Sequence, residues 1–458
     1  MKAKKILLFI IILLLVAVGA IAVIYFKTDI FKTTPQKFWK YANKNSEVME
    51  MFNNNEIQSI KNRRSNNPYT ISSNLNIRNG ADIYNVTTNT NASDVNNIST
   101  DVNFKFNNKD IANFTLMKKS NLFAFMMRDL ANGFIAIKNN NIQELAKEAG
   151  MEDVSNIPDS INWFSMIDLL YIQESDSKYF VDTYSKLIMD NTSKGNYSTE
   201  ESEIKIDNQI HQVTGYKVVL TEKESKELAK RLLIYMRNDD ARAINFISSR
   251  LKLLNLPKKY TEYEVITNKI TDIIEKLDLI EATDEQFLEA TIYVEKGQTL
   301  QTNIKIKDGS VIKIIFKKDE NKLFIVQEEP NEALIKSNNE IIKYIGNIKE
   351  ITLSNELGDD NNSSTIKLNA EFFNNFTIAY DSKITIGYSG EGAIDFDKTP
   401  RIVLNEMETE KLKQTYNTIM YGFGKIFENK KALISSYTNV SNTTIQNTQE
   451  NSTEENQN

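Results

Sequence analysis

The stretch YTISSNLNIR, residues 69–78, decides the fold class because apolar and polar side chains alternate along it. Tyr69, Ile71, Leu75 and Ile77 fall on one side of an extended chain and polar residues on the other, which predicts a strand with one buried and one hydrated face. The same period recurs at 102–106, 111–118, 121–128, 133–138, 197–220, 304–316, 366–372 and 384–388. Short strands separated by polar turns predict an antiparallel meander.

Helical spacing of apolar residues lies between these runs, and it predicts amphipathic helices. They are expected near 34–64, 160–187, 221 onward, 257–277, 331–345 and 405–427. An antiparallel sheet with one apolar face has to bury that face, and these helices are the available cover. The expected fold is therefore α+β, with curved antiparallel sheet covered by helices.

Two segments resemble each other without gaps, VVLTEKESKEL at 218–228 and IVLNEMETEKL at 402–412. Each joins an apolar strand end to a helix with a capping residue, Thr221 or Asn405, and Thr221 with Glu224 forms a capping box. Because the flanking order also repeats, we expect a duplication into α+β domains at 35–256 and 257–437, with Leu220 and Leu404 in equivalent places. The alternative is that two unrelated junctions share cap chemistry.

The N-terminal segment ILLFIIILLLVAVGAIAVIYF, residues 6–26, is apolar and uncharged and follows three lysines. A helix of this length covers the ~30 Å hydrocarbon core of a bilayer, so it predicts a single transmembrane anchor. The lysines place residues 1–5 in the cytoplasm and the body outside, in the cell envelope. The alternative is a cleaved signal peptide with a site near Ala22. Residues 438–458 are almost wholly polar and predict a disordered tail.

Composition excludes several chemistries. The chain has no cysteine and one histidine, His211, which excludes disulfides, thiolate metal sites and cysteine nucleophiles. Asp359-Asp360 and Asp395-x-Asp397 lack the spacing of a calcium loop, and Gly390-Glu391-Gly392 precedes no helix that a phosphate loop needs. The net charge of -6 argues against nucleic acid. We expect no metal, no cofactor and no enzymatic activity.

One group of residues points to a ligand site. Phe123, Phe125 and Met127 alternate on a predicted strand, while Tyr416 and Phe423 lie on the last helix. Aromatic and thioether side chains adapt well to a flexible apolar ligand, so these five residues are expected to line an apolar cavity between sheet and helices. The competing interpretation is an ordinary packed core.

The order of a membrane tether followed by antiparallel strands and helices, over 69–255 and 284–436, resembles the envelope carriers of the LolA and LppX type. That resemblance implies a half-barrel sheet that holds acyl chains against helices. The start FKTTPQKFWKY, residues 31–41, and the junction VVLTEKE also resemble anchored extracytoplasmic bacterial proteins of unknown function. The chain departs from the lipoprotein form of such carriers because it has no lipobox cysteine.

These observations favour a single-span envelope protein whose body binds an apolar or lipid-like ligand or a partner protein. The alternative is a structural or assembly scaffold with no ligand cavity. Beyond the membrane at residues 6–26, the expected partners are a lipid-like ligand or an envelope protein.

Overall fold

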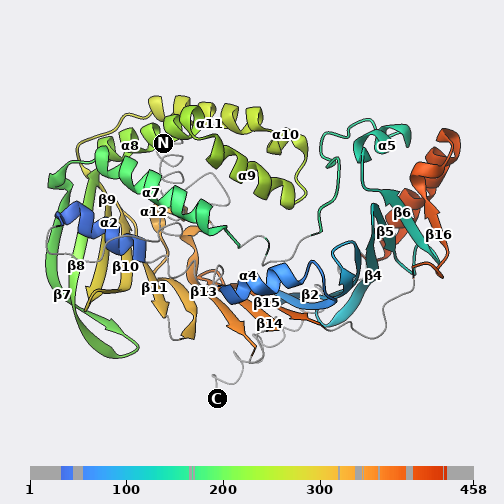
Figure 1. The fold of residues 1–458 in the computed structure, drawn as a ribbon, viewed down its shortest axis with the longest axis horizontal. Coiled ribbons are helices and arrows are strands. Elements are labelled where there is room, and N and C mark those ends of the chain that lie inside the picture. The colour runs from blue at the N-terminus through green and yellow to red at the C-terminus, as the bar shows by residue number, and fades with distance from the viewer. Residues whose placement is uncertain are drawn as a thin grey trace, which may run out of the picture. The chain divides into compact units, whose positions relative to one another are not determined.

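The computed structural model describes residues 32–44, 55–163, 168, 171–317, 320–335, 343, 345–358, 362–387, 396–426 and 428–430. The chain forms two compact units. Unit 1 comprises the described residues within Met1–Ser59, Trp163–Leu357 and Ile366–Asn374. Unit 2 comprises the described residues within Ile60–Asn162, Gly358–Thr365 and Asn375–Asn458. Each unit is built from antiparallel strands with helices, as the alternating sequence pattern predicts (Figure 1).

Unit 1 contains a run of sheet in the hydrogen-bonded order β13-β12-β11-β10-β9-β8-β7. Its strands are β7 (Tyr197–Ile206), β8 (Gln209–Thr221), β9 (Gln286–Glu295), β10 (Gln298–Ile306), β11 (Val311–Lys317), β12 (Lys322–Gln327) and β13 (Ile348–Leu357). A turn that contains Asp308 and Gly309 joins β10 to β11, whose last pair is Lys305 with Val311, and Asp308 has a left-handed φ of 59°.

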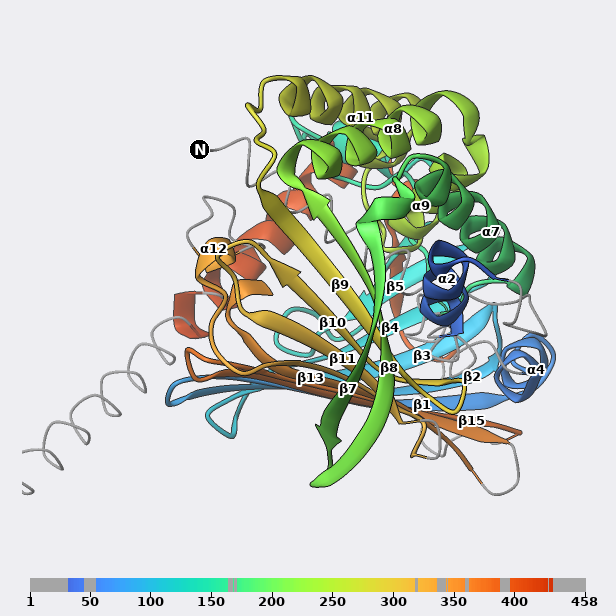
Figure 2. The ribbon, with the colours of Figure 1, turned by 90° about the vertical axis from the view of Figure 1, so that its left-hand side faces the viewer.

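The helices of unit 1 lie over one side of this run of strands (Figure 2). They are α2 (Thr34–Lys44), α7 (Glu174–Asp190), the 3-10 turn η1 (Lys194–Asn196), α8 (Glu222–Asp239), α9 (Ala241–Leu253), α10 (Lys258–Thr261), α11 (Tyr263–Asp278) and α12 (Glu332–Ile335). Apolar side chains of α2, α7, α8, α9 and α11 bury the middle of β8 and β9 in one core. Ile292 of β9 is 1% exposed and Leu277 of α11 is fully buried.

Unit 2 has the strand order β16-β6-β5-β4-β3-β2-β1-β15. The strands are β1 (Tyr69–Asn79), β2 (Asp82–Asp94), β3 (Asn97–Phe106), β4 (Lys109–Lys119), β5 (Leu122–Met126), β6 (Phe134–Lys138), β15 (Phe376–Ile386) and β16 (Arg401–Val403). Residues 363–365 of β14 (Ser363–Phe372) belong to unit 2 and the remainder to unit 1. Neighbouring strands from β15 through β1 to β6 pair antiparallel, whereas β16 runs parallel to β6.

Fewer helical segments accompany the strands of unit 2 in the described part of the chain. They are α4 (Asn55–Arg63), from Ile60 onward, α5 (Ile142–Glu148), the 3-10 turn η3 (Leu404–Glu406) and a helix over residues 409–426. Lys61 and Arg63 lie in the last turn of α4, where cations complement the helix dipole. The predicted meander and its helical cover are therefore present in both units.

The unit boundaries differ from the predicted domains 35–256 and 257–437. Leu220 lies inside β8, opposite Leu288 of β9, whereas Leu404 begins η3 after the short strand β16. The predicted equivalence of these two leucines is wrong. Strand pairing brings 197–221 beside 286–295 within unit 1, so a cut near residue 256 would separate neighbouring strands.

The two predicted caps also differ. Thr221 accepts a hydrogen bond from Glu224 N–H at 3.2 Å while the Glu224 carboxylate accepts from Thr221 N–H at 2.8 Å, which confirms the capping box of α8. Asn405 instead lies within η3, and its Oδ1 accepts from the backbone N–H of Lys138 at 2.6 Å. The cap at Asn405 is wrong because the following helix starts at residue 409. The two segments therefore resemble each other in sequence but not in hydrogen bonding.

The predicted anchor at 6–26 and the predicted tail at 438–458 lie outside the described residues. Of the helices that the structure does describe, none is both long enough and apolar enough to span a bilayer.

Candidate functional site

One face of the sheet in unit 2 presents a continuous set of apolar side chains. Cross-strand pairing joins Leu75 to Val86 and Val86 to Phe104, and it also joins Val102 to Phe114 and Leu116 to Phe125. Directly paired residues share a face of an antiparallel sheet. We call this set, which spans β1 to β5, the apolar face: Leu75, Val86, Val102, Phe104, Phe114, Leu116 and Phe125.

All seven side chains of the apolar face are only partly buried. Burial is deeper toward the ends of these strands. Tyr69 and Ile71 of β1 are buried, and the Arg64 guanidinium beyond α4 lies 5.8 Å from the Tyr69 ring. At β5, Phe125 meets the helix over residues 409–426. Between these places the sheet keeps a partly exposed apolar surface of the kind that marks binding sites.

The structure places the five predicted site residues as follows. Phe125 contacts Phe423 with ring centroids 5.7 Å apart, so these two of the five residues lie together where the strand meets the last helix. Phe125 also contacts Phe114 of β4 at 5.5 Å. Phe123 and Met127 are buried, whereas Tyr416 packs beside the small cluster of Leu145, Ala149 and Leu412. Among the five predicted residues, Phe125 and Phe423 are therefore the two whose rings are partly exposed and contact each other.

Sequence reasoning missed most of the apolar face. Val86 lies in β2, which was not singled out, although Tyr84 and Val86 alternate there with Asn85 and Thr87. Phe104 lies in a predicted strand, but it is not among the five predicted site residues. The signal that could have found them is the shared alternation, but the pairing register that brings them beside Phe114 depends on the whole sheet.

The opposite face of the same strands is polar. Asn85 donates to Asn74 at 2.7 Å and to Asn76 at 2.8 Å, and Thr115 donates to Asp101 at 2.6 Å. We call it the polar face, and it comprises Asn74, Asn76, Asn85, Thr87, Asn89, Asp101, Asn103, Asn113 and Thr115. Cross-strand pairs of this type stabilise a hydrated surface.

A cavity of about 570 Å³ adjoins the polar face. It is lined by Thr87, Asn89, Asp101, Val102, Asn103, Asp110, Ile111, Ala112, Asn113, Phe114, Thr115, Met126, Arg128, Asp129 and Lys430, and none of the five predicted residues is among them. A hydrogen bond from Asn103 at 3.0 Å lowers the pKa of Asp110, although partial desolvation opposes the shift. This cavity is therefore not the apolar cavity that the five residues are predicted to line.

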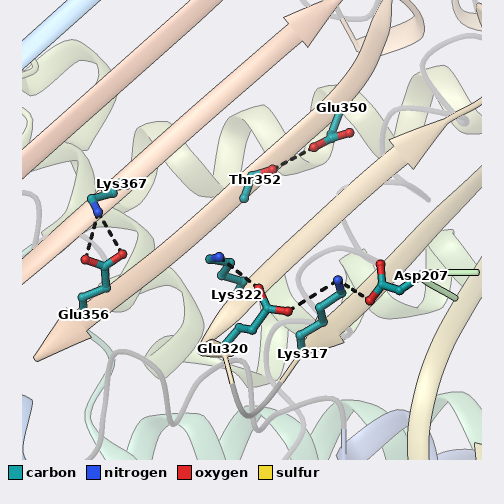
Figure 3. Close-up of polar contacts among 8 residues, drawn as sticks. All are labelled: Asp207, Lys317, Glu320, Lys322, Glu350, Thr352, Glu356 and Lys367. Carbon is teal, nitrogen blue, oxygen red and sulfur yellow. Dashed lines mark hydrogen bonds and ion pairs between the residues drawn. The ribbon is translucent and has the colours of Figure 1, made fainter.

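Unit 1 has its own polar surface, across β11 to β14 (Figure 3). Lys317 forms ion pairs with Asp207 at 2.5 Å and Glu320 at 3.6 Å, and Glu320 also pairs with Lys322 at 2.9 Å. The hydrogen bond to Asp207 raises the pKa of Lys317, and the hydrogen bond from Lys322 lowers the pKa of Glu320.

The same surface continues with two contacts on β13. Lys367 donates to both carboxylate oxygens of Glu356 at 2.8 Å, and the Thr352 hydroxyl donates to Glu350 at 3.0 Å (Figure 3). The pair of Lys367 and Glu356 is exposed and opposite in charge, so it serves mainly to keep this face hydrated.

The residues considered for metal or catalytic chemistry have ordinary structural surroundings. His211 lies on β8 with Nδ1 3.2 Å from a Glu295 carboxylate oxygen. Asp397 forms ion pairs with Lys119 and Arg401, while Asp359, Asp360, Asp395 and the glycines at 390 and 392 lie outside the described residues. Within the part of the chain that the structure describes, no three histidine or acidic side chains form a group that could hold a metal ion.

In comparisons by sequence, no protein-family model and no curated protein matches this chain. Solved structures similar to the chain include a putative outer membrane lipoprotein-sorting protein domain from Vibrio parahaemolyticus, at 8% identity and TM-score 0.18, covering 80% of this chain and 99% of that one. Others are a DUF1329 family protein from Desulfovibrio piger, at 9% identity and TM-score 0.19 over 77% and 96%, and a LolA superfamily protein from Nitrosomonas europaea, at 6% identity and TM-score 0.16 over 73% and 94%.

The family noted from the order of elements is thus among these similar structures. TM-scores this low do not establish a shared fold, and the likeness carries no conclusion about ligands.

Proposed function

We propose that unit 2 binds a lipid-like ligand along its apolar face. The observation that supports this is the row of partly exposed apolar side chains paired in register across five strands. Leaving apolar surface in water costs roughly 25 cal/mol per Å², so an acyl chain laid on this face would stabilise the complex by removing that surface from water.

The chemistry of the face favours a flexible apolar chain. Its seven side chains are aliphatic and aromatic; on the same side of the sheet, Thr88 pairs with Val102 and Lys118 pairs with Phe123 at the margin. The ring contact of Phe125 with Phe423 gives one end of the face an aromatic wall. Aliphatic and aromatic walls bury most of a ligand's surface, while the polar face on the other side keeps the sheet hydrated.

We further propose that the protein is a binding protein of the cell envelope and not an enzyme, held to the membrane by residues 6–26 with its body outside. Support comes from the apolar run itself and from a composition with no cysteine and a single histidine.

Native mass spectrometry of the chain from residue 32 onward, purified without detergent, tests the ligand. The expected result is a folded protein carrying co-purified lipid. Phe125→Asp should lower the lipid-bound fraction, because a carboxylate at this wall opposes an acyl chain. Asn113→Asp is the matched control: it adds the same charge on the polar face of the adjacent strand and should leave lipid binding unchanged.

Two results would contradict the proposal. A folded wild type without lipid would favour the scaffold alternative. Unfolding of Phe125→Asp, measured by circular dichroism, together with no lipid in the wild type would mean that this region is packed core.

A further inference from the structure

A second apolar surface lies in unit 1, at the junction of α9, α10 and α11. Four large apolar or aromatic side chains within ten residues are exposed: Leu254 by 44%, Leu256 by 38%, Tyr260 by 49% and Tyr263 by 40%. Scattered exposed apolar residues are normal on protein surfaces, but four in one short segment form a patch that calls for a partner. We call these four residues the junction patch.

The backbone at the junction patch is held in a defined conformation. Asn255 ends α9 in the left-handed region with φ 60°, its N–H bonds to Lys252 O at 3.0 Å, and Leu256 N–H bonds to Leu251 O at 3.1 Å. This is the Schellman pattern of helix termination. The Ser248 hydroxyl then donates to the buried carbonyl of Thr261 at 2.6 Å, which ties α10 to α9. The patch is therefore presented by a fixed turn.

The charge around the junction patch is opposite to that of the whole protein. Lys252, Lys258 and Lys259 are exposed, and so are Glu262 and Glu264 on either side of Tyr263. The segment 252–264 thus has three lysines and two glutamates, a net charge of +1, although the chain has a net charge of -6. The nearest acids, Glu262 and Glu264, lie at the start of α11, where carboxylates complement the helix dipole. The Lys259 ammonium lies 5.2 Å from the Tyr260 ring.

We propose that the junction patch docks on the surface of an anionic phospholipid bilayer. Tyrosine rings and leucines enter the boundary between headgroups and acyl chains, while lysines stay in the headgroup layer and pair with lipid phosphates. A basic and apolar turn on an acidic protein matches such a surface in both charge and polarity. This contact is independent of the ligand proposed for unit 2 and of the segment 6–26.

A partition experiment tests the charge requirement. The full chain, held in phosphatidylcholine nanodiscs, is mixed with phosphatidylglycerol or phosphatidylcholine vesicles, and flotation measures the bound fraction. Binding should require phosphatidylglycerol. Each lysine near an anionic surface contributes ~1 kcal/mol, so replacing Lys258 and Lys259 together by Gln should weaken binding about 30-fold. Lys269→Gln, at an exposed lysine of α11, is the control and should change binding little.

A second measurement tests whether the junction patch inserts into the bilayer. Because the chain contains no cysteine, Leu256→Cys can carry a single environment-sensitive dye, and Ile210→Cys, at a side chain 68% exposed on β8, is the matched position. The dye at 256 should shift to shorter wavelength with phosphatidylglycerol vesicles, whereas the dye at 210 should not. Equal responses at both positions, equal binding to both lipids, or no response at 256 would each overturn the proposal. In particular, no response of the dye at 256 would favour an acidic protein surface as the partner of the junction patch.

Discussion

The two units use the same strand pattern but cover it to different extents. In unit 1, Leu288, Ala290, Ile292 and Val294 of β9 are all buried in a core formed with residues of α2, α7, α8, α9, α11 and α12. In unit 2, Val86, Val102 and Phe114 occupy the apolar face and stay partly exposed. The difference shows that alternation predicts which face of a strand is apolar, while the number of helices packed on it decides whether that face becomes core or binding surface.

The largest expected effect distinguishes the sheet of unit 1, which is buried beneath helices, from the sheet of unit 2, whose apolar face is partly exposed. Ile292→Asp should destabilise unit 1 by more than about 4 kcal/mol, because it buries an unpaired charge. Val102→Asp should cost unit 2 at most about 2 kcal/mol, since the carboxylate can reach water at a partly exposed position. Hydrogen–deuterium exchange resolves the two units. Equal loss of protection in both would mean that the apolar face of unit 2 is packed as tightly as the core of unit 1.

A buried carboxylate in unit 1 should give the next effect. Asp240 is 1% exposed, accepts the Tyr184 hydroxyl proton at 2.9 Å and caps α9 through Ala243 N–H at 2.9 Å. Asp240→Ala should cost about 2 to 4 kcal/mol, measured by denaturant unfolding, because a helix cap and a buried acceptor are lost together.

Two comparison variants sharpen that result. Tyr184→Phe should cost less than Asp240→Ala because the cap survives. Asn103→Ala on the polar face of unit 2 should cost less than about 1 kcal/mol. A larger effect at Asn103 would show that the polar face contributes more to stability than its exposure suggests.

The two look-alike junctions should respond in different places. Thr221→Ala should cost about 0.5 to 2 kcal/mol and reduce exchange protection at the start of α8, because its cap is lost. Asn405→Ala should cost about 0.5 to 1.5 kcal/mol and reduce protection in β6, where Lys138 N–H loses its acceptor. If protection fell instead in the helix over 409–426, Asn405 would act as a cap after all.

The smallest expected effect is pH-dependent. Partial desolvation of Glu224 is outweighed by hydrogen bonds from Thr221 N–H and Asn196, so its pKa is lowered from 4.5. The free energy that this carboxylate contributes is present above pH 4.5 and is lost as the pH falls through the lowered pKa. The unfolding free energy of unit 1 should therefore fall less on acidification in Glu224→Gln than in the wild type. Parallel pH profiles would assign the acid sensitivity to other groups.

Local patterns in the sequence determined the elements and their chemistry. The alternation at 69–78 predicted β1, and Thr221 with Glu224 predicted the start of α8. Asp308 and Gly309, residues typical of turns, lie between β10 and β11. These signals succeed because strand faces, tight turns and helix caps depend on residues within a few positions of one another. The alternation of Phe123, Phe125 and Met127 also predicted one apolar strand face, and Phe125 on it contacts Phe423 of the last helix.

Only the tertiary structure decided the boundaries of the units and the extent of the site. Pairing of β8 with β9 joins residues on both sides of the predicted boundary at 256, and the register from β1 to β5 assembles the apolar face from distant positions. The local sequence predicts that Asn405 caps a helix, but its side chain accepts a hydrogen bond from the backbone N–H of Lys138, which is far away in the chain. Register and cover are set by long-range burial of apolar surface, for which a single segment of sequence carries no local signal.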